Sequence, residues 1–218
     1  MIILIGGEKG GTGKTTLATN LSALRAAEQK DVLLVDTDQQ SSASYWCGTR
    51  DENNIKPRIA SVQYFGKGFI AQIKDLSRRY DDVIIDAGGR DSTELRDSLL
   101  IATIAVIPLA PSQYDVWTLS RMNELIEKSI TFNTKLKAIL ILNKASSNPS
   151  IKEAEETKNV LEDFENLKLS KAIIHDRIAF RKSVPNGIAI NEQNTIDQKA
   201  LNELNILYNE VFIDDNKN

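Results

Sequence analysis

Short, continuous runs of apolar residues recur along the chain, and longer amphipathic stretches separate them. The runs occupy residues 2–5, 32–35, 83–85, 104–107 and 138–142. Continuous rather than alternating hydrophobicity is typical of strands that are covered on both faces, as in a parallel sheet between two layers of helices. In the stretches between the runs, apolar residues recur at helical spacing, for example Leu17, Leu21 and Leu24. The pattern therefore predicts an α/β fold in which a doubly wound, mostly parallel sheet carries helices on both faces.

The length and composition fit one globular domain. The chain has 218 residues, of which 41% are hydrophobic and 26% are charged, and this is enough to bury a substantial core. We expect residues 1–213 to form this domain and the polar residues 214–218 to be frayed. Residues 48–68 are richer in polar residues and glycine, and we interpret them as an irregular connection with one weak strand around residues 58–62.

The sequence also limits where the protein works. Cys47 is the one cysteine, which excludes an intrachain disulfide and a Cys-x-x-Cys metal site. No apolar run approaches the roughly 20 residues that cross a bilayer, and no basic leader precedes the first run. We therefore expect a cytoplasmic protein that does not bind membranes. The formal net charge of −3 means that any binding to nucleic acid must come from a local basic patch.

The most specific motif is a glycine-rich segment between the first apolar run and the first amphipathic stretch, Glu-Lys-Gly-Gly-Thr-Gly-Lys-Thr-Thr at residues 8–16. A phosphate-binding loop requires this position between a strand and a helix. In such a loop backbone amides face the phosphates, Lys14 reaches the β- and γ-phosphates, and the Thr15 hydroxyl ligates Mg²⁺. The alternative is a strand-to-helix turn that holds no ligand. The predicted nucleotide-binding residues are Gly10, Gly11, Thr12, Gly13, Lys14, Thr15 and Thr16.

This loop departs in two respects from the general pattern Gly-x4-Gly-Lys-Ser/Thr. Glu8 stands where the first glycine would be, and Lys9 precedes the paired glycines. Lys-Gly-Gly-Thr-Gly-Lys-Thr resembles the deviant Walker loop of the ParA/MinD ATPases. The resemblance implies that ATP and Mg²⁺ are the ligands, and that Lys9 crosses a dimer interface to the partner's nucleotide. Taken alone, Lys9 is better explained as a solvated loop lysine.

A second motif, at residues 32–40, is an apolar run that ends in Asp36 and Asp38. At the carboxyl end of a strand such groups lie where Mg²⁺ and the attacking water need acceptors. The segment resembles the family's Asp-x-Asp-Pro-Gln, with Gln39 in place of the proline. By resemblance, Asp38 orients the hydrolytic water and Asp36 supports the metal and the switch. The alternative is that both carboxylates cap the helix that follows Ser41.

A third motif, at residues 80–89, contains an apolar run that ends in Asp86, in the manner of a Walker B carboxylate. By resemblance Asp86 holds Mg²⁺ through water. Gly89 completes an Asp-x-x-Gly spacing, which can place a backbone amide on the γ-phosphate and couple its presence to residues 90–97. This segment is therefore a candidate switch.

Two later segments also resemble family motifs. Residues 106–115 resemble the Ile-Pro-x-x-Pro-Ser segment that leads into a helix on the dimer-facing side, although a proline-shaped turn explains them equally well. Asn143 ends the last apolar run with an amide suited to reading the edge of adenine, and by resemblance it is the base contact. A simple turn asparagine is nearly as good an explanation.

The stretch from Lys171 to Lys182 is locally basic in an acidic protein. It includes an Asp-Arg-x-Ala-Phe-Arg segment that resembles the family's late Arg-x-x-Tyr/Phe-Arg stretch. Arg181 and Lys182 are the predicted contacts to DNA phosphates, with Lys171 and Arg177 as further contributors. A solvated basic face explains the same residues equally well.

Taken together, the resemblance implies a small ParA-type partition ATPase. Such a protein forms a homodimer on binding ATP, binds DNA non-specifically at the nucleoid, and positions a plasmid, a chromosome or another cargo when a small adaptor protein stimulates hydrolysis. Because the first apolar run begins at residue 2, we expect no DNA-reading domain before it. The alternatives are a MinD-like ATPase on another surface and a metabolic P-loop ligase similar to dethiobiotin synthetase. Lys9 and the Asp36/Asp38 pair argue against the ligase.

Overall fold

The computed structural model describes residues 1–89, 91–111, 116–148, 164 and 166–213. The described strands are β1 (Ile2–Ile5), β2 (Val32–Asp36), β3 (Ala60–Gln63), β4 (Asp82–Asp86), β5 (Ile104–Leu109), β6 (Lys137–Ala145) and β7 (Lys168–His175). The described helices are α1 (Lys14–Ala27), α2 (Ser42–Glu52), α3 (Phe69–Leu76), α4 (Thr93–Leu99), α5 (Val116–Phe132), α7 (Ile178–Ser183) and α8 (Gln198–Phe212), with 3₁₀ turns η2 (Val184–Asn186) and η3 (Ile190–Glu192). The predicted tail at 214–218 and residues 112–115 of the predicted proline segment lie outside the described residues.

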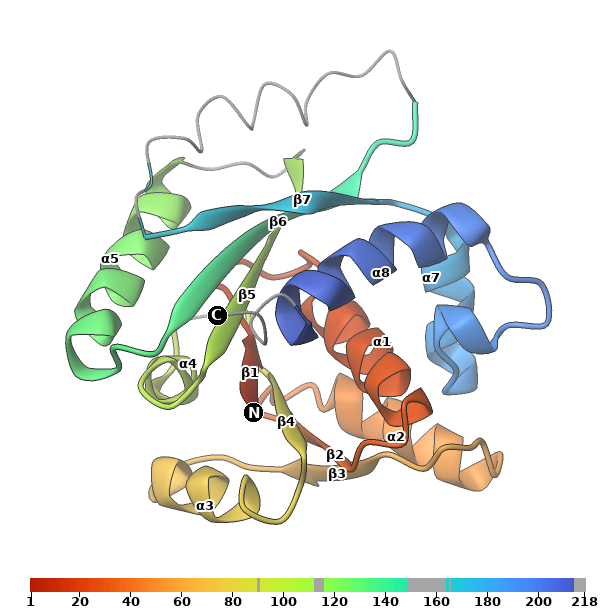
Figure 1. The fold of residues 1–218 in the computed structure, drawn as a ribbon, viewed down its shortest axis with the longest axis horizontal. Helices are drawn as coiled ribbons and strands as arrows, with labels where there is room; N and C mark the ends of the chain where they lie inside the picture. Colours follow the sequence, from red (N-terminus) through yellow and green to blue (C-terminus); the bar gives the residue numbers. More distant parts are fainter. Residues whose placement is uncertain (90, 112–115, 149–163, 165, 214–218) are drawn as a thin grey trace.

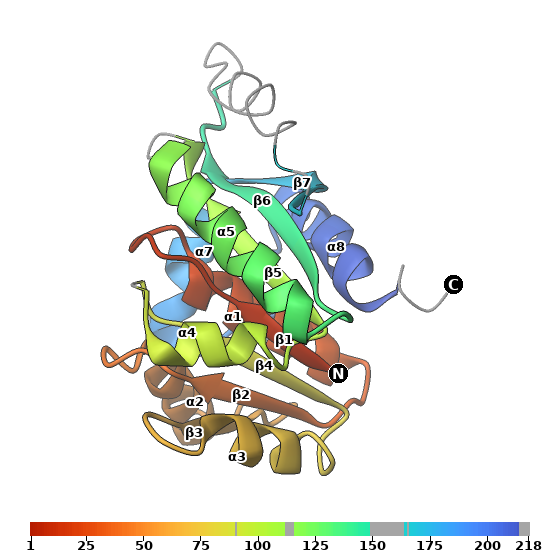
Figure 2. The ribbon, with the colours of Figure 1, turned by 90° about the vertical axis from the view of Figure 1, so that its left-hand side faces the viewer.

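The described strands form one sheet in the order β3-β2-β4-β1-β5-β6-β7, and every pair of neighbours is parallel. Helices α1, α2, α7 and α8 cover one face of this sheet, and α3, α4 and α5 cover the other (Figures 1 and 2). Within β1, Ile3 and Ile5 pack into the first layer, whereas Ile2 and Leu4 pack into the second. Both sides of the strand must therefore be apolar. The predicted doubly wound α/β fold is confirmed.

Three elements differ from the expectation. Helix α2 continues to Glu52, so the irregular connection begins later than residue 48. The weak strand is present, but it occupies Ala60–Gln63. Strand β7 was not expected at all: it lies at the edge of the sheet, and from Ser170 onward its buried residues alternate with exposed or partly exposed ones. Its two lysines and its serine hide it from a search for continuous apolar runs, because an edge strand is covered on fewer sides.

A buried ion pair joins α2 to the segment that follows α7. The side chain of Arg50 is 1% exposed, and its guanidinium donates to both carboxylate oxygens of Glu192 at 2.6 and 2.9 Å. It also donates to the carbonyl oxygens of Gly187 and Pro57. Gly187 has φ +66°, and a Cβ there would lie 2.7 Å from the backbone nitrogen of Arg50. The close approach therefore requires glycine at this position.

Candidate functional site

The carboxyl ends of β1, β4 and β2 bring the predicted motifs together. In the register of the sheet, Ile5 lies beside Asp86, and Asp86 lies beside Asp36. The glycine-rich loop leaves β1 directly after Ile5 and ends where α1 begins at Lys14. The carboxyl ends of parallel strands are where ligands bind in folds of this type.

The loop has the backbone shape that a phosphate-binding loop requires. Gly11 and Gly13 have φ values of 77° and 90°, which other residues adopt only under strain. Gly13 directly precedes α1, whose first amides and positive dipole end favour an anion.

The Lys14 side chain folds back over this loop. Its Nζ donates to the Lys9 carbonyl oxygen at 2.8 Å, and the side chain is buried. Burial lowers the pKa of Lys14, and the negative charges of Asp86 and Asp38 act against that shift. The Lys14 ammonium therefore lies near two carboxylates, and it would also attract the negative charge of a polyphosphate.

Asp86 is a buried carboxylate with one oxygen held and the other lacking a partner. Its Oδ2 accepts a hydrogen bond of 2.7 Å from the Thr15 hydroxyl. Its Oδ1 is buried and has no hydrogen bond to any residue that the structure describes. Burial raises the pKa of Asp86 to about 7, with the Thr15 hydrogen bond opposing the shift. A cation at this carboxylate would stabilise its ionised form.

This arrangement fits Mg²⁺ bound together with a nucleotide. Across the described ranges, no group of three or more His, Cys, Asp or Glu side chains forms a metal site by itself. Mg²⁺ bound with nucleotides commonly takes one or two protein ligands and completes its shell with phosphate oxygens and water. Thr15 and Asp86 would hold such an ion.

Asp36 is engaged by the backbone. Its Oδ1 accepts from the amide of Asp38 at 3.0 Å, and its Oδ2 accepts from the amide of Ser44 in the first turn of α2 at 2.9 Å. The side chain is fully buried. Asp36 therefore shapes the loop that carries Asp38 and caps α2, which is the role that the sequence had left open for this pair. Its support of the metal stays a prediction.

Asp38 lies at the edge of a cavity of about 610 Å³ beside the phosphate loop. The cavity is lined by Gly10 and Gly11, by residues 37–40, by Gly88 and Gly89, and by Phe65, Ser92 and Glu94. One carboxylate oxygen of Asp38 accepts from the amide of Gln40 at 3.0 Å. The volume of this cavity is that of an ordinary ligand pocket. The sequence did not indicate Phe65, because a lone loop aromatic carries no motif.

The segment after β4 rests directly on the phosphate loop. A Cβ at Gly89 would lie 2.8 Å from the Gly10 Cα and 3.4 Å from Lys14 Nζ. Only glycine allows two backbones to approach this closely. Gly89, which leads into the predicted switch segment, is thus in contact with the predicted phosphate loop.

Asn143 supports the phosphate loop from the end of β6. Its Nδ2 donates to the Thr12 carbonyl oxygen at 2.7 Å, and a Cβ at Gly13 would lie 2.3 Å from that nitrogen. Next to it, Lys144 Nζ donates to the Gly11 carbonyl oxygen at 2.7 Å. Sequence reasoning missed Lys144, although it directly follows a residue that was singled out. The contact of Asn143 with adenine stays a prediction.

The predicted DNA contacts lie apart from this site, on α7. Arg181 and Lys182 are exposed, and Arg181 Nε is 3.6 Å from Asp176 Oδ1. Arg177 is engaged instead with Glu203, at 2.5 Å, and this pair ties the start of α7 to α8. Of the two further contributors, Lys171 is exposed on β7.

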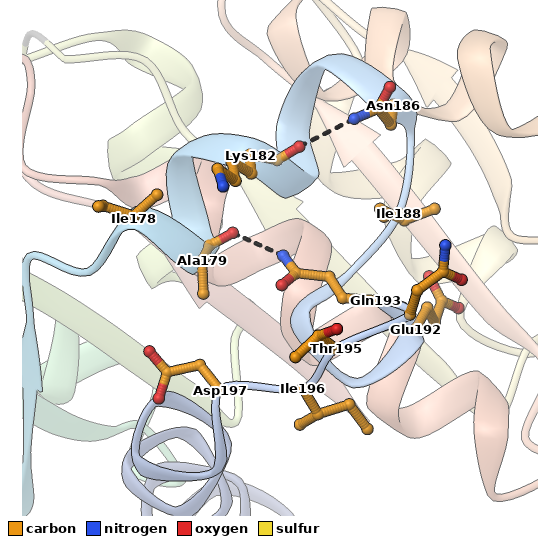
Figure 3. Close-up of a pocket in the computed structure, with 11 residues that line it drawn as sticks. Ile178, Ala179, Lys182, Asn186, Ile188, Glu192, Gln193, Thr195, Ile196 and Asp197 are labelled. Carbon is orange, nitrogen blue, oxygen red and sulfur yellow. Dashed lines mark hydrogen bonds between the residues drawn. The ribbon is translucent and has the colours of Figure 1, made fainter.

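Lys182 also lines a cavity of about 640 Å³ between α7 and residues 186–197 (Figure 3). Within its wall, Gln193 Nε2 donates to the Ala179 carbonyl oxygen at 2.7 Å. This cavity shares no lining residue with the cavity beside the phosphate loop. It is therefore a separate hollow, next to the basic residues.

Comparison with known sequences agrees with the geometry, which defines a P-loop nucleotide-binding protein. The profile of the CobQ/CobB/MinD/ParA nucleotide binding domain matches residues 3–190. The chain belongs to this family. It is 28% identical over 207 residues to maintenance of carboxysome distribution protein A of Halothiobacillus neapolitanus, covering 94% of this chain and 93% of that protein. It is 26% identical to sporulation initiation inhibitor protein Soj of Bacillus subtilis, covering 85% and 88%. These relatives are of the ParA/MinD positioning type.

Solved structures share the fold. A plasmid partition protein of Borrelia burgdorferi bound to AMPPNP superimposes with a TM-score of 0.72 at 20% identity, covering 96% of this chain and 99% of that one. MinD of Pyrococcus horikoshii with Mg-ADP gives 0.70 at 20% identity, covering 97% and 96%. Cobyrinic acid a,c-diamide synthase of Mycobacterium smegmatis with ADP and magnesium gives 0.69 at 17% identity, covering 84% and 92%. The expectation of ATP and Mg²⁺ agrees with the ligands of these relatives.

Among the described residues, no helix combines the length and the apolar character that crossing a membrane requires.

Proposed function

We propose that this chain is a ParA-like ATPase. It binds ATP with Mg²⁺, pairs with a second copy in the ATP state, binds DNA without sequence preference, and positions a plasmid, a chromosome or another cargo. A small adaptor protein that binds DNA or the cargo stimulates hydrolysis and so releases the ATPase from DNA.

One observation carries the proposal: the Thr15 hydroxyl donates at 2.7 Å to the buried carboxylate of Asp86, so the phosphate loop and the end of β4 meet at one site. In the proposed site Lys14 neutralises the β- and γ-phosphates, Thr15 and Asp86 hold Mg²⁺, and Asp38 orients the attacking water. Lys9, which stands at the loop position of the deviant Walker lysine, reaches the partner's nucleotide across the dimer interface.

Two variants test the chemistry. Lys14→Ala should lose nucleotide binding, because backbone amides alone cannot match the charge of the polyphosphate. Asp38→Ala should still bind ATP and form a dimer that persists in size-exclusion chromatography, because the metal ligands remain while the water loses its acceptor. Tight binding of a fluorescent ATP analogue by Lys14→Ala, or full turnover by Asp38→Ala, contradicts the proposed site.

The role of Lys9 is tested by mixing variants. Lys9→Ala should retain ATP binding as a monomer but lose dimerisation and turnover. Mixing it with Asp38→Ala shows whether each chain supplies its lysine to the other chain's site. If Lys9→Ala pairs and hydrolyses ATP as wild type does, the crossing lysine is wrong.

A metabolic ligase is the second candidate, because cobyrinic acid a,c-diamide synthase shares the fold. A ligase turns over ATP only with a small carboxylate or amine substrate, whereas the proposed ATPase responds to DNA together with an adaptor protein. Measuring ATP turnover with and without DNA therefore separates the two classes, and a MinD-like protein would respond to another surface instead.

A further inference from the structure

Glu8 occupies the loop position where the general phosphate-loop pattern has glycine. Its side chain is only 8% exposed, and its Oε1 is buried without a hydrogen bond to any part of the chain that the structure describes. A buried carboxylate next to a site for an anionic ligand is unfavourable unless a cation balances it. Arg121 on α5 supplies that cation, because its Nη2 lies 3.4 Å from Glu8 Oε1.

The same guanidinium nitrogen contacts a second carboxylate. Arg121 Nη2 lies 3.6 Å from Asp91 Oδ2. Asp91 belongs to the predicted switch segment after β4, and it is held in turn by Arg96 of α4, whose Nε donates to Asp91 Oδ1 at 2.7 Å. Arg121 therefore bridges the phosphate loop and the switch segment.

This bridge meets the phosphate loop at Glu8, next to Lys9. On one side of Lys9, Glu8 is joined through Arg121 to Asp91. On the other side, Gly10 is in close backbone contact with Gly89. The phosphate loop is thus linked to Asp91 of the switch segment on one flank of the lysine, and on the other flank it contacts Gly89, which leads into that segment. A displacement of that segment by a γ-phosphate would be carried to Lys9.

We propose that Arg121 is a positioning residue for ATP hydrolysis, which holds Glu8 against Asp91 so that Lys9 and the switch segment move as one unit. The inference rests on the proposed function, because it concerns the rate of ATP turnover. It adds a residue of α5 that belongs to none of the motifs recognised in the sequence.

The kinetic test compares Arg121→Gln, Glu8→Gln and the double variant with wild type. Each single change should lower kcat roughly three- to tenfold while KM for ATP stays within about twofold, because the ligand contacts of Lys14 and Thr15 are kept. The kcat of the double variant should fall no further than that of the less active single variant, since the two side chains act as one bridge. Arg121→Lys should recover part of the rate, because the positive charge remains.

Lys128→Gln is the matched control. Lys128 lies on the same helix, its side chain is 75% exposed, and its Nζ lies 4.0 Å from Glu124 Oε2. It should keep wild-type kcat. A purely structural role of Arg121 predicts a lower melting temperature with unchanged kcat, and that result overturns the inference. Losses that multiply in the double variant overturn it as well.

Hydrogen exchange supplies a readout that needs no hydrolysis. In nucleotide-free protein, Arg121→Gln should increase amide exchange in both residues 8–13 and residues 91–99, whereas Lys128→Gln should change neither. Increased exchange in only one of the two segments contradicts the bridge. If wild type does not turn over ATP with DNA present, the proposed function fails, and the exchange result still decides whether the two segments are coupled.

Discussion

The Thr15 hydroxyl donates a 2.7 Å hydrogen bond to Asp86 Oδ2, and this bond joins the start of α1 to the end of β4. It satisfies one carboxylate oxygen and leaves the buried Oδ1 without a hydrogen bond to a described residue. Burial therefore makes this carboxylate costly to ionise. Mg²⁺ would relieve that cost, because it stabilises the charge that burial opposes.

The first prediction concerns the pH dependence of stability without nucleotide. The pKa of Asp86 is raised from 3.8 to about 7, so the folded protein keeps a proton that the unfolded chain has already released. Stability from this group is therefore present at low pH and is lost as the pH rises through about 7. Asp86→Asn cannot ionise, and its melting temperature should fall less than that of wild type between pH 5.5 and pH 8.

Differential scanning fluorimetry at several pH values measures this difference. The nearby charged groups Asp36, Asp38 and Lys14 remain in the variant, so the comparison isolates Asp86. Adding Mg²⁺ and ADP should raise the melting temperature of wild type more than that of Asp86→Asn. Identical pH profiles for the two proteins contradict the raised pKa.

The second prediction concerns the contact between the phosphate loop and Gly89, which leads into the switch segment. In Gly89→Ala the new Cβ would meet the Gly10 Cα at 2.8 Å, and neither backbone can yield cheaply. The switch segment should be pushed off the loop, and ATP turnover should fall by at least roughly tenfold, as small misplacements near a reacting group often cause.

Gly48→Ala is the matched glycine substitution. Gly48 is exposed within α2, and a Cβ there meets nothing within 4 Å. This change should stabilise the protein by about 0.5–1 kcal/mol, because alanine is the better helix former, and it should leave turnover unchanged. Equal activity of both alanine variants would show that Gly89 and Gly10 do not need their close contact.

The third prediction concerns the buried pair of Arg50 and Glu192. Arg50→Met should lower the free energy of unfolding by about 3–5 kcal/mol, because it leaves the Glu192 carboxylate without its cation. The double variant Arg50→Met/Glu192→Gln should recover part of that loss. Arg58, which pairs with Asp51 at the surface, provides the control, since Arg58→Met should change stability little. Urea denaturation measures all three, and similar losses for Arg50 and Arg58 contradict the prediction.

The sequence predicts those features in which local pattern and tertiary role coincide. The loop at Gly13 and Lys14 can be predicted, because its backbone shape restricts the residue types. The strand that ends in Asp86 can be predicted as well, because burial on both faces requires apolar residues. By contrast, β7 is an edge strand whose pattern is diluted by polar residues. The partners of Arg50 and Glu8 lie 142 and 113 positions away in sequence, and no local spacing records such a contact.

The same limit applies to the Asp36 and Asp38 pair. Both residues are aspartates of one motif, but the fold gives their side chains different surroundings. Asp36 is buried and accepts two backbone amides, whereas Asp38 lines the cavity. Which carboxylate shapes the loop and which faces the ligand depends on where α2 docks, and the sequence motif does not contain that information.

The last prediction concerns the attachment to DNA. Arg181 and Lys182 are exposed on α7, whereas Arg177 is held by Glu203. We therefore expect Arg181 and Lys182, rather than Arg177, to contact phosphates. A single chain offers few contacts, and two chains paired by ATP would double them, so ATP but not ADP should switch on binding to unrelated DNA sequences.

Salt dependence gives the decisive measurement. Removing two phosphate contacts in each of two chains should reduce the slope of log affinity against log salt by up to about 3.6, at about 0.9 for each contact. Arg181→Gln/Lys182→Gln should show this reduction equally on every DNA sequence. Lys74→Gln/Arg79→Gln removes the same charge from the region of α3, which covers the opposite face of the sheet from α7 (Figure 1), and it should keep the wild-type slope. An unchanged slope in the α7 variant, or binding that ignores the nucleotide, overturns the assignment and favours another surface for this ATPase.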